Sequence, residues 1–218
     1  MTTMAATADA LPAGWATAAL GEVCTIVSGA TPKTSVDEFW DGDVRWATPK
    51  DLSDLDQKFI RDTPRKLTAT GLRSCAAQLL PAGSVLLSSR APIGLVAINT
   101  VPMATNQGFK SLVPNSAFVD SSFLYWWLKT HRSDLEAMGR GATFKEISKA
   151  ITASITIPLP PIEEQRQIAA VLDQADELRA KRRAALALLD TLTESIFLDM
   201  FGDPVTNPMG LPARTLGT

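Results

Sequence analysis

Two patterns of apolar and polar residues divide the chain. Over residues 11–157, short apolar runs alternate with turn-forming residues. Runs such as 84–88 and 95–98 have the length of strands and are partly β-branched, and segments containing Gly and Pro, such as 80–83 and 91–94, separate them. This pattern predicts a loop-rich sheet domain.

One helix is expected within this domain, over residues 121–138, with Asp120 or Ser121 as its cap. The apolar residues that recur close to helical spacing are Phe123, Leu124, Trp127, Leu128, Leu135 and Met138. The neighbouring rings of Tyr125, Trp126 and Trp127 could stack on bases. Aromatic clusters on amphipathic helices usually belong to the core, however, so these rings are expected to be buried.

A long helix is expected after a proline-rich boundary. The segment 158–161, Pro-Leu-Pro-Pro, prevents a helix before it and supplies a proline for the first helical turn. Glu163 and Glu164 then suit the positive end of a helix dipole. Because neither Pro nor Gly occurs from there to Met200, the pattern predicts a helix within 158–200 of about 38 residues, about 57 Å long at 1.5 Å per residue.

Apolar residues of this helix follow a seven-residue repeat that Arg182 interrupts, and further leucines widen the stripe. A helix packed on its own domain alone is the alternative, but so long a helix would extend beyond that domain. The repeat therefore predicts a coiled-coil interface with a second helix or a partner subunit. Its expected residues are Ile168, Val171, Leu172, Ala175, Leu178, Ala185, Leu186, Leu189, Leu192 and Ile196.

Both ends of the chain are expected to lie outside these two regions. Residues 1–10 are expected to be a disordered N-terminus. After the helix, residues 201–218 form either a C-terminal tail or the start of a second repeat, because the segment 210–218 echoes residues 11–22 in its Leu-Pro-Ala and Leu-Gly pairs.

Composition indicates a soluble, cytoplasmic protein. No apolar run approaches the roughly 20 residues of a membrane helix, and no basic residue precedes an apolar stretch near the N-terminus. Cys24 and Cys75 lack a CxxC pairing and, with the single His131, are too few for an ordinary zinc site. Free thiols fit a reducing compartment, where they usually act as small buried apolar residues. We therefore expect no metal and no cofactor.

The charge is unevenly distributed along the chain, although the net charge is −2. Residues 1–57 carry three Lys/Arg against nine Asp/Glu, whereas residues 58–149 carry twelve against five. The middle of the chain is therefore the part best suited to face phosphate groups.

Catalytic motifs are not recognisable in this sequence. A glycine-rich S-adenosylmethionine loop and an Asn/Asp-Pro-Pro-aromatic motif, which an adenine methyltransferase needs, do not occur. Asp56-Gln57-Lys58 is the nearest approach to a nuclease motif, and it follows a polar, Asp-rich loop instead of a strand. We expect a protein that binds and does not catalyse.

Several stretches, taken in order, resemble the specificity (S) subunits of Type I restriction-modification systems. They are LPAGWATAALGEVCTIVSGATPKT, VRWATPKDL, SSRAPIGLVAI, NQGFKSL, GATFKEISKAITASITIPLPPIEEQRQIAAVL and FGDP. The resemblance implies an α+β fold in which a mixed α/β target-recognition domain, residues 11–157, precedes a spacer helix that pairs antiparallel with a counterpart. It also implies double-stranded DNA, two modification (methyltransferase) subunits and two restriction subunits as partners.

An S subunit of this kind has two recognition domains and two spacer helices, whereas this sequence contains one of each and the opening of a second repeat. A natural half-size subunit and the N-terminal half of a longer one both remain open. In the half-size case a second copy is expected to pair through the spacer helix, which gives a homodimer.

Candidate DNA contacts lie on expected loops. Segments 88–90, 105–110 and 140–145 belong to the stretches shared with the family and are expected to shape the domain or bind phosphate. Segment 51–74 lies outside those stretches, so we favour it for reading bases. The candidates are Lys33, Lys50, Lys58, Arg61, Arg65, Lys66, Arg73, Arg90, Asn106, Gln107, Lys110, Arg140, Thr143 and Lys145.

The leading hypothesis is thus a non-catalytic specificity subunit that directs methyltransferase and restriction subunits to a bipartite DNA target. The alternative is a coiled-coil interaction protein that dimerises or caps methyltransferase subunits without binding DNA.

Overall fold

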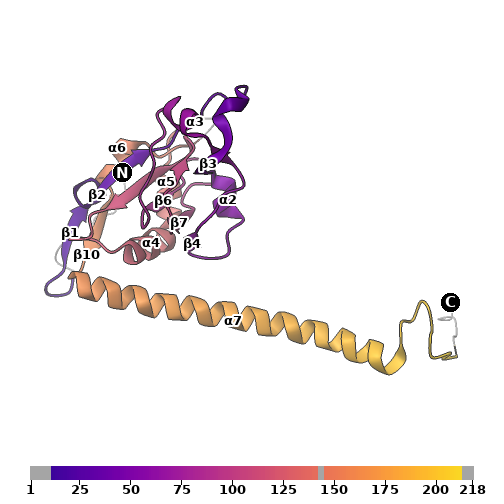
Figure 1. The fold of residues 1–218 in the computed structure, drawn as a ribbon. Helices are drawn as coiled ribbons and strands as arrows, with labels where there is room; N and C mark the ends of the chain where they lie inside the picture. Colours follow the sequence, from indigo (N-terminus) through magenta and orange to yellow (C-terminus); the bar gives the residue numbers. More distant parts are fainter. Residues whose placement is uncertain (1–10, 142–144, 213–218) are drawn as a thin grey trace. The chain divides into compact units, whose positions relative to one another are not determined.

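The computed structural model describes residues 11–141 and 145–212 (Figure 1). Chain contacts divide the protein after Ala169, into a domain and a second unit that begins at Ala170. The expected disordered N-terminus, residues 1–10, and the candidate Thr143 lie outside the described residues.

The domain contains ten strands: β1 (Ala16–Ala19), β2 (Cys24–Ser28), β3 (Trp40–Ala47), β4 (Phe59–Ile60), β5 (Lys66–Leu67), β6 (Val85–Leu87), β7 (Val96–Asn99), β8 (Ala104–Thr105), β9 (Lys110–Pro114) and β10 (Thr156–Leu159) among the described residues. Short helices join them: α1 (Leu20–Val23), η2 (Asp37–Phe39), α2 (Pro49–Ser53), α3 (Ala69–Arg73), α4 (Ser121–Thr130), α5 (Arg132–Met138) and α6 (Lys149–Ser154). The two apolar runs expected as strands coincide with β6 and β7.

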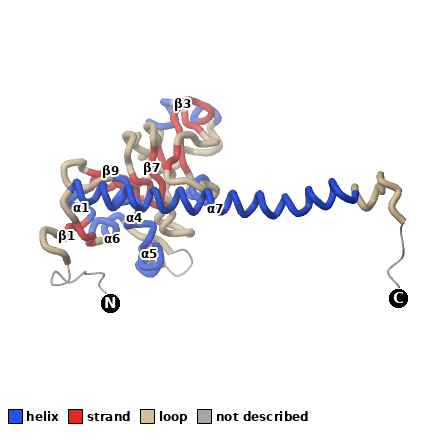
Figure 2. Tube along the Cα trace, turned by 90° about the horizontal axis from the view of Figure 1, so that it is seen from below, coloured by secondary structure: helices blue, strands red, loops and turns tan. Residues whose placement is uncertain are grey.

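Three sheets organise these strands. The largest has the order β2-β9-β6-β7-β4, the second has the order β5-β3-β8, and β1 pairs with β10 in the third. In the last pair, Ala16 lies opposite Leu159 and Ala19 opposite Thr156, so the first and last strands of the domain are antiparallel neighbours. Nearby, α6 lies against α1 (Figure 2).

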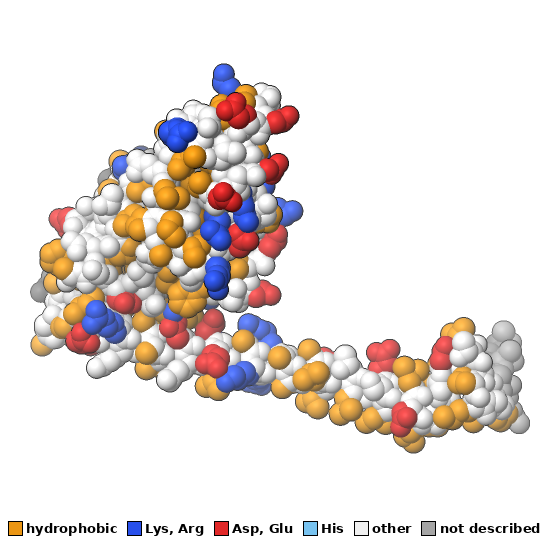
Figure 3. Space-filling view, viewed as in Figure 1, with side chains coloured by type: hydrophobic (Ala, Val, Ile, Leu, Met, Phe, Trp, Pro, Cys, Tyr) orange, Lys and Arg blue, Asp and Glu red, His pale blue; other side chains and the backbone are white. Residues whose placement is uncertain are grey.

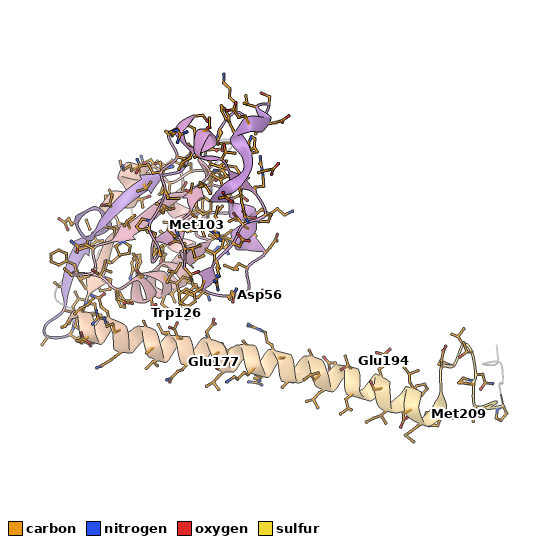
Figure 4. All side chains as sticks on the ribbon, viewed as in Figure 1. Asp56, Met103, Trp126, Glu177, Glu194 and Met209 are labelled. Carbon is orange, nitrogen blue, oxygen red and sulfur yellow. The ribbon has the colours of Figure 1, made fainter. Side chains whose placement is uncertain are left out.

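The core lies between these sheets and the helices that cover them. One buried cluster contains Leu86, Met103 and Phe109, and Figure 4 labels Met103 within the domain. A smaller cluster surrounds Trp46 and Leu67 of the second sheet. The side chains of Phe123–Leu128 on α4 are buried, and α4 lies against β6 and β7. The aromatic cluster is therefore part of the core, as expected.

The expected single helix over 121–138 is wrong, because α4 and α5 are separate helices on either side of His131. The Thr130 hydroxyl donates to the carbonyl oxygens of Trp126 and Trp127, and the His131 ring nitrogen lies 2.8 Å from the Trp127 oxygen. These side chains compete for carbonyl oxygens of the last turn, which ends the helix there. At its other end Asp120 caps α4 by accepting from the Ser122 and Phe123 amides, as expected.

The long helix α7 (Ile162–Phe201) begins within the domain and continues through the second unit. Pro158 and Leu159, which the prediction placed in the spacer segment 158–200, belong to β10 and not to the helix. The Pro161 carbonyl oxygen accepts from the Gln165 amide, so this proline precedes the first turn instead of lying in it. Gln165 is fully buried, donates to the carbonyl oxygens of Phe118 and Pro160, and accepts from the Asp120 amide. These bonds fix the start of α7 to the domain.

In the second unit, large apolar side chains of the expected coiled-coil seam are exposed. Val171 and Leu178 retain 65% and 66% of their accessible surface, and Leu189, Leu192 and Ile196 are also exposed. Figure 3 shows hydrophobic side chains along the length of this helix. Among the described residues, no helix has both the length and the apolar character needed to cross a membrane. The echo expected over 210–218 falls largely outside the described part of the chain.

Candidate nucleic-acid interface

Five loop segments and the start of β9 meet at one end of the domain's strands. Because β2 and β6 both run antiparallel to β9, their carboxyl ends lie beside its amino end. In the second sheet β3 and β8 run parallel, with Ala47 opposite Thr105, so these two strands also end side by side. We call the region at these ends the strand-end surface. It comprises residues 29–33, 48–50, 88–90, 105–110, 140–141 and 145–146.

Backbone hydrogen bonds join these segments directly. The Ala30 amide donates to the Thr105 carbonyl oxygen at 3.0 Å, and the Asn106 amide donates to the Ala47 oxygen at 3.0 Å. The Ser89 amide donates to the Gly108 oxygen at 2.7 Å. Just after the third family-type segment, the Ile147 amide donates to the Ser89 oxygen at 2.9 Å. Segments 88–90 and 105–110 and the described ends of segment 140–145, expected as separate candidates, are therefore parts of one structure.

Gly29 is required for the close approach of two of these loops. A Cβ atom at this position would lie 2.0 Å from the carbonyl oxygen of Asn106 and 2.4 Å from that of Thr105. No side chain fits at such a distance, so glycine allows the loop after β2 to lie directly on the loop after β8.

Glu146 holds two basic side chains on this surface. One carboxylate oxygen lies 2.9 Å from Arg90 Nε, and the other lies 2.9 Å from Lys110 Nζ. Partial burial opposes ionisation of Glu146, but hydrogen bonds and the positive charges of Lys110 and Arg90 outweigh that burial and lower the pKa of the carboxyl group. The backbone of Glu146 also pairs with that of Arg140, through two hydrogen bonds of 2.9 and 3.0 Å.

Two lysines among the candidate DNA contacts are buried, and Lys110 lies in a strand instead of the expected loop. Lys110 is the first residue of β9, is 7% exposed, and is neutralised by Glu146. Lys58 is 9% exposed, donates to Ser122 Oγ at 3.2 Å, and lies over the rings of Phe59 and Tyr125. In both cases neighbouring groups replace the water that a surface lysine would bind.

Asn106 and Gln107 have different roles: Asn106 shapes the loop, and Gln107 is exposed. The side-chain oxygen of Asn106 accepts from the Gly108 amide at 2.9 Å, which shapes the loop. Gln107 is exposed, and its side-chain oxygen accepts from the Thr31 hydroxyl. Gln107 is therefore the member of the pair whose remaining donors are accessible to DNA.

Other candidates lie on the strand-end surface as exposed cations: Lys33, Lys50, Arg90, Arg140 and Lys145. Lys50 reaches this surface through its neighbour Pro49, which packs so closely on Gly108 that an added Cβ there would lie 3.0 Å from the proline ring. The arrangement can supply several hydrogen-bond donors of positive charge to phosphate oxygens.

Segment 51–74, which we favour for base reading, has both ion-paired and exposed basic residues. Lys66 and Arg45 share the carboxylate of Asp62, at 3.4 and 3.1 Å. The amide of Thr63 and these two cations lower the pKa of Asp62. Arg61 is exposed, and so is Arg73, whose contact with Thr70 Oγ1 is long at 3.5 Å.

Arg65 lies beside two tryptophans that the sequence analysis did not single out. Its guanidinium carbon is 3.8 Å from the centroid of the Trp40 ring and 5.0 Å from that of Trp46. The two rings contact each other edge to face at 5.2 Å. The register of β3 shifts between Trp40 and Val44, so simple alternation along the strand could not have paired the two rings. The role of Glu146 had no local signal either.

Cysteines and carboxylates could in principle hold a metal or act as nucleophiles. Within residues 11–141 and 145–212, no cluster of three His, Cys, Asp or Glu side chains is arranged to hold a metal. Burial raises the pKa of the Cys24 thiol to about 12, and Cys75 is partly buried. Asp56 is exposed on the loop between α2 and β4 (Figure 4).

Known proteins are similar to this chain in sequence. A family model described as the Type I restriction modification DNA specificity domain matches residues 12–188. The MjaIX specificity subunit of Methanocaldococcus jannaschii is 34% identical over 195 residues, which are 88% of this chain and 45% of that protein. The EcoR124I/EcoR124II specificity subunit of Escherichia coli is 28% identical over 166 residues, 73% of this chain and 40% of that protein.

Solved structures of Type I subunits are also similar to this chain. The HsdS subunit from Thermoanaerobacter tengcongensis superposes with a TM-score of 0.66 and 29% identity, covering 88% of this chain and 46% of that one. A chain from a structure describing complex assembly and conformational transition of a type I R-M system gives a TM-score of 0.69, also at 29% identity, covering 85% and 44%. The chain thus spans less than half the length of these relatives.

Proposed function

Because this chain belongs to the family of Type I restriction-modification DNA specificity domains, we propose that it selects the DNA sequence on which a Type I complex acts. In this function the chain binds double-stranded DNA and is not itself a catalyst. Methylation and cleavage belong to the modification and restriction subunits, with which it would act in the cytoplasm.

The observation that carries the proposal is the strand-end surface. Segments matching the family stretches meet there, and they present Lys33, Lys50, Gln107 and Lys145 as exposed side chains, with the exposed Arg140 directly before one of them. Cationic and amide donors on one surface suit the phosphates and base edges of a duplex. The ion pairs of Glu146 with the buried Lys110 and the exposed Arg90 keep the loops in place without drawing on these side chains.

We further propose that α7 pairs with a second copy of this chain, or with an equivalent helix in a longer subunit. The support is the exposed apolar seam from Val171 to Ile196, since such a stripe is stable in water when another helix covers it. Modification subunits are the other partners expected to contact this helix. A chain that binds through α7 without contacting DNA remains the second candidate function, favoured by the same seam.

Antiparallel pairing of two copies would have a consequence for the target sequence. A two-fold axis relates the two domains, so each would read the same half-site on opposite strands. Both must meet one face of the duplex, which favours centres one helical turn, about 34–36 Å, apart. With half-sites of about 3–4 base pairs, the target is an interrupted palindrome with an unread gap of roughly 6–7 base pairs.

The test is to map methylated adenines in cells that carry this chain and its modification subunit, beside cells with the modification subunit alone. We expect one interrupted palindromic motif that requires this chain. In vitro, the pair should shift duplex DNA in a salt-dependent way. An asymmetric bipartite motif would exclude the homodimer, and a complex that forms without any DNA shift or motif would favour the second candidate function.

A further inference from the structure

We propose that Arg65 reads a guanine in the target half-site and that Trp40 is the residue that positions it. The inference rests on the proposed function, since it names the residue through which the recognition domain distinguishes one base. It assigns a specificity-determining role to one cation among the many on this domain.

The geometry of Arg65 is set by stacking. Its guanidinium group lies over the Trp40 ring at 3.8 Å from the centroid, while Trp46 contributes a second ring at 5.0 Å. Arginine is planar, and stacking on an aromatic face fixes that plane and removes much of its rotational freedom. Since the residue is exposed, the N–H groups at the edge of the plane remain available to a ligand.

The tryptophan pair, Trp40 and Trp46, is itself firmly attached to the strand-end surface. Trp40 Nε1 donates to the carbonyl oxygen of Lys33 at 3.3 Å, and Trp46 Nε1 donates to that of Ala30 at 3.0 Å. The Trp46 amide donates to the carbonyl oxygen of Arg65 at 3.3 Å. Arg65 is therefore held beside the loop 29–33 by its backbone as well as by its side chain.

Arg65 differs from four basic residues nearby in having no carboxylate partner, since Asp62 pairs with Arg45 and Lys66, and Glu146 pairs with Arg90 and Lys110. It differs from the exposed Arg61 and Arg73 in its two tryptophan contacts. In the part of the chain that the structure describes, no ion pair engages Arg65. A preoriented arginine without a carboxylate partner suits an incoming acceptor pair, because neither an ion pair nor much side-chain entropy is lost on binding.

Guanine is the base whose major-groove edge matches this group. Its O6 and N7 atoms are two acceptors in one plane, and a guanidinium group can donate to both. A phosphate oxygen needs no such fixed plane and is equally well served by flexible lysines on the strand-end surface. Arg65 also lies in segment 51–74, outside the stretches shared with the family, where a residue that differs between targets is expected.

The experiment compares Arg65→Lys, Arg65→Ala and Trp40→Ala with a control, Arg132→Ala, using the methylated-adenine motif as the readout. Arg132 is an exposed arginine of α5 that pairs with Glu136 and is not among the candidate DNA contacts. Both Arg65 variants should relax one guanine position, by about 5- to 150-fold in discrimination, which is the usual value of a bidentate contact. Trp40→Ala should relax the same position by a smaller factor, and Trp40→Phe should restore part of it. Arg132→Ala should leave the motif unchanged.

A chemical substitution in the DNA tests the same contact independently of protein folding. Replacing the assigned guanine with 7-deazaguanine removes the N7 acceptor, so wild-type binding should weaken while binding by Arg65→Ala should not change further. If Arg65→Ala does not fold, the same comparison is made between the wild-type protein and Arg65→Lys.

The other outcomes overturn the inference. An unchanged motif in the Arg65 variants excludes base reading by this residue. A uniform loss for all sequences that lysine restores identifies a phosphate contact. If the wild-type chain directs methylation to no motif at all, the proposed function fails, and that result is distinct from failure of the Arg65 assignment.

Discussion

The ion pairs of Glu146 allow a quantitative prediction for Glu146→Gln. The substitution keeps the size of the side chain and an acceptor oxygen but removes the charge that faces Lys110 and Arg90. Lys110 is 7% exposed, and apart from Glu146 its nearest hydrogen-bond partner is Ser89 Oγ at 3.5 Å. The variant therefore leaves a nearly buried ammonium group without a counter-charge.

Removing one partner of a buried ion pair costs about 3–5 kcal/mol. The Glu146 side chain retains 31% exposure and glutamine can still accept from Lys110, so we expect a loss of about 2–3 kcal/mol in the free energy of unfolding. For a domain of this size, that loss lowers Tm by about 4–12 °C. Glu136→Gln is the matched control, because its pair with Arg132 is exposed on both sides and should cost below about 1 kcal/mol.

The same substitution has a defined pH dependence. The pKa of Glu146 is lowered in the folded protein relative to the ordinary value of 4.5. Its ionised form therefore contributes its full stabilisation above pH 4.5, and this contribution is lost as the pH falls through the lowered folded-state pKa. The stability difference between wild type and Glu146→Gln should accordingly be constant near neutral pH and shrink below pH 4.5.

Tryptophan fluorescence during thermal unfolding is the appropriate assay. All five tryptophans of the chain lie between residues 15 and 127, so the signal reports the domain and not the exposed part of α7. Equal Tm values for Glu146→Gln and Glu136→Gln at pH 7 would refute the reasoning. So would a difference from wild type that grows on acidification.

Three further predictions follow from the exposed seam, the strand-end surface and the core. Charged residues in place of Leu189 and Leu192 should yield monomers in sedimentation experiments, and an unchanged oligomer would mean that the seam is not the interface. Lys145→Ala should weaken binding to all DNA sequences and reduce the salt slope by up to about one unit; unchanged affinity would remove it from the interface. Lys110→Ala, in contrast, should act mainly by lowering stability. Cys24, with its pKa raised to about 12 by burial, should resist alkylation in the native protein at pH 8 and react after denaturation, whereas rapid native labelling of it would contradict the buried position.

Features set by local sequence were predictable. The absence of Pro and Gly with a seven-residue repeat is enough to predict α7, and the strand-length runs at 84–88 and 95–98 gave β6 and β7. The cap of α4 could be narrowed to Asp120 or Ser121 because capping depends on neighbouring residues, and Asp120 is the cap. Prediction failed at His131, where side-chain bonds to the backbone end a helix that the apolar spacing would continue.

Features set by long-range contacts were not predictable. Lys110 has a surface-like sequence environment, and its burial depends on Glu146, 36 residues away. The convergence of the three family-type loops depends equally on strand order, which short apolar runs do not encode. The base-reading role of segment 51–74 stays a prediction, now with Lys58 removed from its exposed residues.

The pairing of β1 with β10 makes the recognition domain an exchangeable unit. Residues 20–155 form one continuous segment, and the strands on either side of it, Ala16–Ala19 and Thr156–Leu159, pair with each other. Another domain would connect to Ile162 without a change in the helix if its terminal strands paired in the same register and if it offered Gln165 the same backbone groups as Phe118 and Asp120. Recombination at these two short strands would thus transfer an entire binding preference at once, whereas point substitutions would have to alter it one contact at a time.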